Sequence, residues 1–156
     1  MSCENAVITD VVVTTPDQTV TQALKVMDDN RIRRLPVIDE NRKYLGSISL
    51  RTILRKLLPA AVTMEEGLTN LEFLRNADSD ISDRLEILSR KTVSEIMATE
   101  ITCADMGTSL WEAIRILVND NSPVPVIDEN TKQFLGILTF QSVLGELRRK
   151  HPEHLG

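Results

Sequence analysis

Two seven-residue stretches of this chain are nearly identical, and they decide its fold. Residues 35–41 read Leu-Pro-Val-Ile-Asp-Glu-Asn, and residues 124–130 read Val-Pro-Val-Ile-Asp-Glu-Asn. Each stretch is followed by an aromatic residue, Leu and Gly, at 44–46 and at 134–136. A short apolar run, a polar turn and a second apolar run predict two strands joined by a turn. Because this pattern occurs twice in the same order, the chain is predicted to contain two copies of one small α/β unit.

The similarity extends upstream into a helix in each copy. Apolar residues recur at helical spacing over residues 20–27 and again over residues 110–117. Thr19 and Ser109 each stand three residues before a Gln or a Glu. That spacing is typical of a capping box, so both helices are expected to begin in the same way.

A further strand is expected before each of these helices. It lies near residues 11–14 in the first copy and 101–104 in the second. Pro36 and Pro125 fall at the start of the middle strand, where a missing N–H is tolerated. Each unit therefore reads as strand, helix, strand, turn, strand and helix.

The turn and the last helix of each unit are also visible in the sequence. Residues 39–42 and 128–131 are polar and turn-forming. Closing helices are expected near residues 50–58 and 140–150, and Pro59 ends the first of them.

A charged segment at residues 61–91 connects the two copies. Its leucines and isoleucines predict helices with one apolar face, at Leu68, Leu71, Leu74, Ile81, Leu85 and Leu88. That face either packs on the module's own core or forms a dimer contact. We therefore predict a first unit at residues 1–60, a helical connector at 61–91 and a second unit at 92–156.

Composition excludes several classes of protein. The chain has 156 residues and a net charge of −5, which argues against a general nucleic-acid binder because phosphate binding needs a basic surface. No apolar run approaches the roughly 20 residues that cross a bilayer. The N-terminus lacks the pattern of a secretory signal. These features predict a cytoplasmic protein with no membrane partner, and the start at Met1 favours a complete chain over a fragment of a larger channel, transporter or synthase.

Catalytic chemistry finds little support in the sequence. Cys3 and Cys103 give neither a disulfide framework nor a metal-ligand spacing, and His151 and His154 fall in a polar terminal tail. No Ser-His-Asp set, Cys-His pair or phosphate-cradling glycine loop is recognisable. We therefore predict that the chain is not an enzyme and holds no metal.

Taken together, the motifs resemble the cystathionine-β-synthase (CBS) domain family. The resemblance rests on Val-Thr-Thr-Pro-Asp at 13–17, Ala-Leu-Lys-Val-Met at 23–27, Arg-Leu-Pro-Val-Ile-Asp at 34–39, Leu-Gly-Ser-Ile-Ser at 45–49, and the second copy of the set. Val-Ser-Glu-Ile-Met at 93–97 is typical of the lead into a second such domain. Two CBS domains in one chain form a pair called a Bateman module.

The resemblance implies a fold and a function. It implies two βαββα units packed sheet to sheet about a pseudo-twofold axis, with related clefts between them, and a homodimer of such pairs. Many members of the family bind AMP, ADP, ATP or S-adenosylmethionine and regulate an attached or partner protein. A ligand acts in this way when it favours one placement of the two units.

The resemblance also implies which residues would bind the ligand. Ligand-binding copies often carry a hydroxyl residue at the start of the closing helix and, three residues later, an Asp that accepts hydrogen bonds from the ribose. Here the hydroxyl is kept at Ser49 and Thr139, but Thr52 and Ser142 stand in the Asp positions. A neutral hydroxyl does not replace a carboxylate, so we expect weaker nucleotide binding, a different ligand or an empty cleft. The alternative role of Ser49 and Thr139 is helix capping.

A basic cluster precedes the middle strand of the first copy only. Basic residues just before this Pro contact phosphates in some relatives, which makes Arg33 and Arg34 candidate phosphate ligands, and a guanidinium suits phosphate oxygens. The alternative is a solvated strand entrance. The backbone around Leu35 and Val124 is a candidate for reading an adenine edge. The complete candidate set is Arg33, Arg34, Leu35, Pro36, Ser49, Thr52, Val124, Pro125, Thr139 and Ser142.

Two functions remain in competition after this reasoning. One is a regulatory CBS pair that binds an adenosine-type nucleotide between its units and modulates a partner protein. The other is a ligand-free dimerisation module whose nucleotide sites have degenerated. The missing ribose carboxylates favour the second, and the Arg33–Arg34 pair favours the first.

Overall fold

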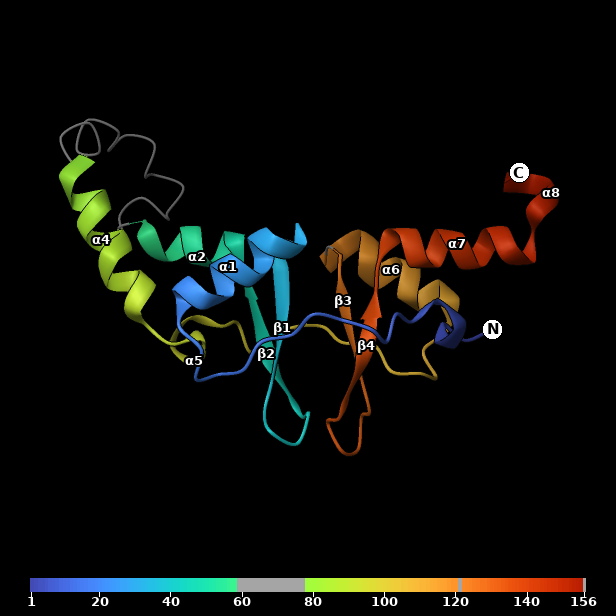
Figure 1. The fold of residues 1–156 in the computed structure, drawn as a ribbon. Helices are drawn as coiled ribbons and strands as arrows, with labels where there is room; N and C mark the ends of the chain where they lie inside the picture. Colours follow the sequence, from blue (N-terminus) through green and yellow to red (C-terminus); the bar gives the residue numbers. More distant parts are fainter. Residues whose placement is uncertain (59–77, 121, 156) are drawn as a thin grey trace. The chain divides into compact units, whose positions relative to one another are not determined.

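The computed structural model describes residues 1–58, 78–120 and 122–155 (Figure 1). It is a mixed α/β structure with two small sheets, each of two strands, which confirms the predicted fold class. Contacts divide the chain into two compact units. Unit 1 comprises Met1–Val13, Ile38–Leu45 and Glu100–Gly156, and unit 2 comprises Thr14–Val37 and Gly46–Thr99. The predicted helix end at Pro59 and the connector positions Leu68, Leu71 and Leu74 lie outside the described residues.

Unit 2 is built around the first copy of the repeat. Its elements are α1 (Val20–Asn30), most of β1 (Arg34–Ile38) and of β2 (Tyr44–Ser49), α2 (Leu50–Leu57), α4 (Asp78–Arg90) and α5 (Val93–Ile96). Ile38, Tyr44 and Leu45, at the turn end of the two strands, belong to unit 1. The predicted capping box starts α1, because Thr19 Oγ1 accepts from Gln22 N at 3.1 Å and Gln22 Oε1 accepts from Thr19 N at 2.8 Å. The helix ends at Arg31, whose φ of 54° is left-handed and whose N–H donates to Asp28 O.

Unit 1 is built around the second copy. Its elements are the 3-10 helix η1 (Glu4–Ala6), α6 (Leu110–Asp120), β3 (Val124–Ile127), β4 (Phe134–Leu138), α7 (Phe140–Lys150) and α8 (Pro152–Leu155). β3 and β4 pair antiparallel with an irregularity between Val126 and Ile127. The core lies between this hairpin and the helices, and it includes Val124, Val126 and Leu138 with Ala113 and Leu117 of α6.

The second predicted capping box is only half formed. Ser109 Oγ accepts from Glu112 N at 3.1 Å, as expected. The Glu112 carboxylate instead accepts two hydrogen bonds from Arg115, which lower the pKa of Glu112. The sequence signal for the helix start was therefore right, although the acidic side chain has another partner.

The predicted first strands were wrong as strands. In each copy the segment makes one parallel bridge to the middle strand, between Thr14 and Val37 in unit 2 and between Ala104 and Val126 in unit 1. Thr14 N donates to Pro36 O at 3.0 Å, and Ala104 N donates to Pro125 O at 2.9 Å. The next hydrogen bond of a parallel ladder would need an N–H from the proline itself, which has none, so pairing stops after one bridge.

The turns and closing helices agree with the sequence. Asp39 Oδ1 accepts from Asn41 N and Lys43 N, and Asp128 Oδ1 accepts from Asn130 N and Thr131 N. The closing helices α2 and α7 end within one residue of their predicted ends.

The second strand of each sheet is covered by the segment that precedes the other copy. In unit 2, Ser47 and Ala98 exchange two backbone hydrogen bonds of 2.9 and 2.8 Å. In unit 1, Ile8 and Ile137 exchange two of 2.8 and 2.9 Å. The N-terminal segment therefore completes the sheet of the second copy.

This exchange explains why each copy carries a glycine after its aromatic-Leu pair. A Cβ on Gly46 would lie 2.4 Å from Ala98 O, and a Cβ on Gly136 would lie 2.2 Å from Ile8 O. Only a residue without a side chain lets the backbone at Ala98 or Ile8 approach the strand so closely.

The connector helix α4 packs within unit 2. It contacts α1 and α2, and Thr21 Oγ1 donates to Ser89 O at 2.9 Å. Leu88 is buried, whereas Ile81 and Leu85 are exposed. The apolar face was predicted either to pack on the module's own core or to form a dimer contact, and Leu88 packs on the core. No helix among the described residues is long and apolar enough to cross a membrane.

Candidate functional site

In unit 2 the candidate residues lie where β1 begins and α2 begins. The two places are joined because Leu50 N, the first amide of α2, donates to Arg33 O at 3.0 Å. This bond brings Arg33 beside the Ser49–Thr52 turn. The grouping expected from sequence is therefore present around one strand entrance.

The apolar candidates contribute backbone rather than side chains. Leu35 and Val124 are 0% and 2% exposed, and Pro36 and Pro125 are also buried. The carbonyl oxygens of both prolines accept backbone hydrogen bonds, from Thr14 N and from Ala104 N respectively. Their side chains are part of the core, and a role for the nearby backbone in reading adenine stays a prediction.

The hydroxyl candidates of unit 2 cap the start of α2. Ser49 Oγ accepts from Thr52 N at 3.1 Å and lies 2.9 Å from Thr52 Oγ1, with which it shares a hydrogen bond. Ser49 is buried and Thr52 is half-buried. The two hydroxyls therefore satisfy each other and one amide of the helix.

Unit 1 repeats this arrangement as a complete capping box, in which Thr139 and Ser142 bond each other reciprocally. Thr139 Oγ1 accepts from Ser142 N, and Ser142 Oγ accepts from Thr139 N, both at 2.9 Å. Ser142 Oγ also donates to Thr139 O at 3.1 Å. Val124 pairs with Leu138, the residue just before this cap, so the strand entrance and the helix start are adjacent here as well.

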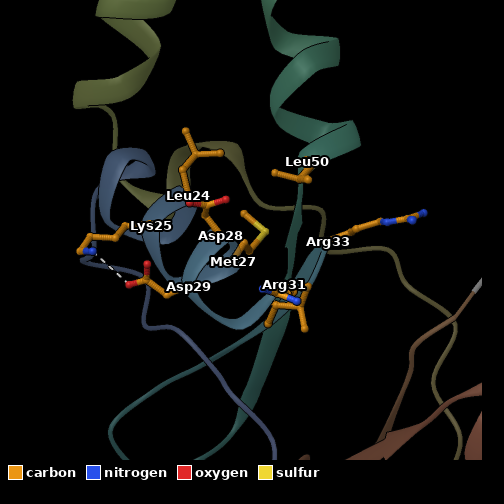
Figure 2. A pocket seen from close by; sticks show the side chains of 9 residues that line it. Leu24, Lys25, Met27, Asp28, Asp29, Arg31, Arg33 and Leu50 are labelled. Carbon is orange, nitrogen blue, oxygen red and sulfur yellow. Dashed lines mark hydrogen bonds and ion pairs between the residues drawn. The ribbon is translucent and has the colours of Figure 1, made fainter.

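An open groove of about 660 Å³ lies in unit 2 between the end of α1 and the start of α2 (Figure 2). Its lining residues are Leu24, Lys25, Met27, Asp28, Asp29, Arg31, Ile32, Arg33 and Leu50. Lys25 and Asp29 form an exposed ion pair of 3.0 Å at its rim. Figure 2 shows the Arg33 side chain pointing away from α1 and from these carboxylates, and Arg33 is exposed. Its guanidinium is therefore accessible to an anion from solvent.

The corresponding strand entrance of unit 1 has no basic residue in its described part. Ser122 and Pro123 precede Val124 there, and Asn121 lies outside the described residues. The charge difference expected between the two copies is thus carried by Arg33 and Arg34.

A family model for the CBS domain matches this chain twice, over residues 4–59 and 93–149. The two matches coincide with the two copies whose geometry is described above. The chain belongs to the CBS domain family. It is a tandem CBS pair.

Two curated proteins similar to this CBS pair are much longer than it. MJ1225 of Methanocaldococcus jannaschii is 33% identical over 137 residues, which is 86% of this chain and 43% of that protein. Inosine-5'-monophosphate dehydrogenase of the same organism is 26% identical over 151 residues, 96% of this chain and 24% of the enzyme. The chain thus spans less than half the length of either relative.

Solved CBS structures share the fold. The crystal structure of MJ1225, a proposed archaeal homologue of γ-AMPK, matches with a TM-score of 0.73 and 25% identity over 94% of this chain and 47% of that one. CBSX2 from Arabidopsis thaliana matches with a TM-score of 0.70 and 23% identity over 96% of this chain and 98% of that one. CBSX2 has also been solved in complex with AMP, and that structure matches with a TM-score of 0.63 and 24% identity over 90% of each chain.

The CBS pair has an exposed apolar face that sequence reasoning missed. On α6 and α7 of unit 1, Trp111 is 84% exposed, Val118 69%, Leu144 54% and Phe140 48%. Between these helices lies a groove of about 240 Å³ lined by Ile114, Leu117, Val118, Phe140, Val143, Leu144 and Leu147. Trp111 and Val118 lie outside the apolar stripe that the two copies share. Their apolar character at those positions was the sequence signal that could have indicated this face.

A buried carboxylate on α7 was also missed. Glu146 is 4% exposed, and Arg149 and Lys150 on the same helix pair with it. The hydrogen bonds from Arg149, followed by those from Lys150, lower the pKa of Glu146. These pairs give the residue a structural role at the end of α7.

Metal and thiol chemistry stay unsupported in the described part of the chain. No group of three or more His, Cys, Asp or Glu side chains there could hold a metal ion. Burial raises the pKa of both the Cys3 and the Cys103 thiols, which disfavours the reactive thiolate.

Proposed function

We propose that this CBS pair binds an adenosine-type nucleotide, AMP, ADP, ATP or S-adenosylmethionine, and thereby modulates a partner protein. The observation that carries the proposal is the exposed side chain of Arg33, a residue whose backbone is joined to the start of α2 by the Leu50–Arg33 hydrogen bond. A planar guanidinium matches phosphate oxygens in geometry and charge. The AMP complex of CBSX2, which has the same fold, supports the ligand class.

Regulation would follow from a shift between placements of the two units. A ligand that contacts one placement better than another changes the populations by its difference in affinity. A partner that binds one of those placements would then respond to the nucleotide. The compartment, expected to be the cytoplasm, and the identity of the partner stay predictions.

Thermal unfolding with and without each nucleotide tests the proposal. A ligand present at about 100 times its Kd should stabilise the protein by roughly 2.7 kcal/mol. Arg33→Ala is expected to weaken binding of AMP and ATP about tenfold or more, since it removes charge-assisted hydrogen bonds, and to change adenosine binding less than threefold. Isothermal titration calorimetry measures the three constants.

The matched control is Arg55→Ala, an exposed arginine on α2 of the same unit. It removes the same charge without touching the strand entrance and should leave all three constants unchanged. Equal weakening of adenosine and AMP by Arg33→Ala would contradict a phosphate role. An absence of any shift at millimolar nucleotide would remove the ligand-binding function.

A second function, pairing with another copy of the chain, is favoured by the α6–α7 face. The repeat allows a direct comparison, because unit 2 has Thr21 and Asp28 where unit 1 has Trp111 and Val118. An exposed Trp beside an apolar groove on one surface is self-complementary, which suits a twofold dimer in which each Trp enters the partner's groove. We therefore propose that the homodimer forms through unit 1.

Leu144→Glu is expected to convert this dimer to a monomer at micromolar concentration, because a buried unpaired charge opposes association. Analytical ultracentrifugation measures the state, and fluorescence of Trp111, the one tryptophan in the sequence, reports its burial independently. Leu54→Glu, the corresponding exposed position on α2, is the control and should remain dimeric. A monomeric native protein, or a Leu144→Glu dimer, would contradict the assignment.

A further inference from the structure

The two copies of the repeat differ in what packs against their pair of helices. In unit 2, α4 contacts both α1 and α2, and its Leu88 is buried (Figure 1). Thr21 Oγ1, near the start of α1, donates to Ser89 O of α4 at 2.9 Å. The α1–α2 pair is therefore partnered by a further helix of the same chain.

The repeat identifies the corresponding place in unit 1. The backbone hydrogen bond that joins Val20 N to Lys91 O, directly after α4, recurs between Leu110 N and Met1 O. Trp111, the residue after Leu110, thus has the position of the residue that bonds α4 in unit 2. The described residues of unit 1 leave Trp111 84% exposed, on the helix that forms one wall of the apolar groove.

The sequence of α4 shows what kind of helix suits such a place. Ile81, Leu85 and Leu88 recur at i, i+4 and i+7, so they form one apolar stripe along α4. The α6–α7 face of unit 1 is apolar as well, and its groove of about 240 Å³ runs between two helices. A helix with a single apolar stripe can bury that stripe in such a groove.

The charges beside the groove favour an acidic helix. α4 has four acidic and two basic residues, and it contacts α2, whose last turn is basic. α7 has three exposed basic residues in its last turn, Arg148, Arg149 and Lys150, against one acidic residue, Glu146. Arg148 lies one turn beyond Leu144, so the two share a side of α7. An acidic helix in the groove would meet complementary charge at this end.

We infer that the α6–α7 face of unit 1 docks an acidic amphipathic helix of a partner protein, one that resembles α4 in its apolar stripe and negative net charge. The inference rests on the proposed modulation of a partner, and it specifies how that partner is recognised. The helix and a second copy of the chain compete for this one face. A bound partner helix should therefore convert the proposed dimer into a monomer that holds one helix.

The probe is a synthetic peptide with the sequence of residues 78–90, covalently linked between positions 86 and 90 on the side opposite its apolar stripe. The link is needed because so short an isolated helix is marginal in water. Titration into the full chain should shift the emission of Trp111, the one tryptophan of the sequence, to shorter wavelength until it saturates. Sedimentation should show the dimer dissociating. A control peptide with Ile81→Ser, Leu85→Ser and Leu88→Ser should do neither.

Variants of the full chain locate the bound peptide, with affinity measured from a fluorescent label on the peptide. Leu144→Glu should weaken binding at least tenfold, because it places an unpaired carboxylate in the groove. Arg148→Glu should weaken it about fivefold at low salt and less at high salt, since charges at a rim are screened. Leu54→Glu and Arg55→Glu, on α2 of unit 2, are the controls and should bind the peptide as the native chain does. Circular dichroism and thermal unfolding check that all four variants fold.

The outcomes separate this inference from the other proposals. Equal binding to the native chain and to Leu144→Glu would place the peptide elsewhere and overturn the inference. A dimer that persists at millimolar peptide, with unchanged Trp111 emission, would assign the face to the second copy and overturn it too. A native monomer that binds the peptide through Leu144 supports the inference and contradicts the proposed dimer. Calorimetry with nucleotide on the same samples tests nucleotide binding separately, so a chain that binds nucleotide and not the peptide loses only the inference.

Discussion

Replacing Gly136 by alanine should lower the free energy of unfolding by about 3 kcal/mol, the upper end of the range for overpacking. The new Cβ would lie 2.2 Å from Ile8 O and 2.8 Å from Val7 Cγ1, closer than atoms approach without movement. The obstacle is backbone, so the N-terminal segment must shift and its two hydrogen bonds with Ile137 are lost. For a chain of this length the melting temperature should fall by about 6 to 12 °C.

Gly145→Ala is the matched control for this change. Gly145 lies in α7, is exposed, and has no atom within 4 Å of an added Cβ. Alanine is the better helix former, so this variant should gain about 0.5–1 kcal/mol. Chemical denaturation of both variants measures the difference. Equal stability of the two would show that the crossing segment does not pack against β4 in solution.

Leu35→Ala should cost about 2–5 kcal/mol, the range for a fully buried leucine. Leu35 is 0% exposed and occupies the second position of β1. Its removal deletes buried methyl groups and leaves a cavity that the sheet cannot fill. Urea unfolding at neutral pH gives the value.

Leu54→Ala is the corresponding control, because Leu54 is 62% exposed on α2. It should change stability by no more than about 0.5 kcal/mol. A Leu35→Ala variant as stable as Leu54→Ala would contradict the core assignment. The comparison also matters for ligand studies, since lost nucleotide binding in Leu35→Ala would report unfolding rather than a missing contact.

The repeat made most of the fold predictable. The Thr19 capping box, the Asp39 and Asp128 turns and both closing helices follow from short-range rules that act within a few residues. These features needed no knowledge of distant contacts. The predicted first strands failed because one missing N–H, at Pro36 or Pro125, outweighs the strand propensity of a whole apolar segment.

Long-range features were beyond the sequence. Nothing in the composition of residues 1–13 indicates that Ile8 pairs with Ile137, more than 120 residues away. The glycines at 46 and 136 were visible as part of the motif, but their reason lies in the crossing backbone.

Only part of the candidate site could be predicted, because only part of it depends on the order of elements along the chain. That Arg33 and Ser49 are adjacent follows from the predicted pair of strands joined by a turn, because the first strand begins beside the end of the second. The hydroxyl bonds that occupy Thr52 and Ser142 depend on side-chain geometry. The Trp111 face depends on comparing the two copies position by position.

The segments that pair through Ile8 and Ala98 also set the order in which the two units can fold during synthesis. Unit 2 is complete once residue 99 has left the ribosome, because Ala98 supplies its last pairing. Residues 1–13 belong to unit 1, and their pairing partner Ile137 is made only after all of unit 2. Until then residues 1–13 have no sheet to join, so the nascent chain carries a finished unit 2 and an unpaired segment before it.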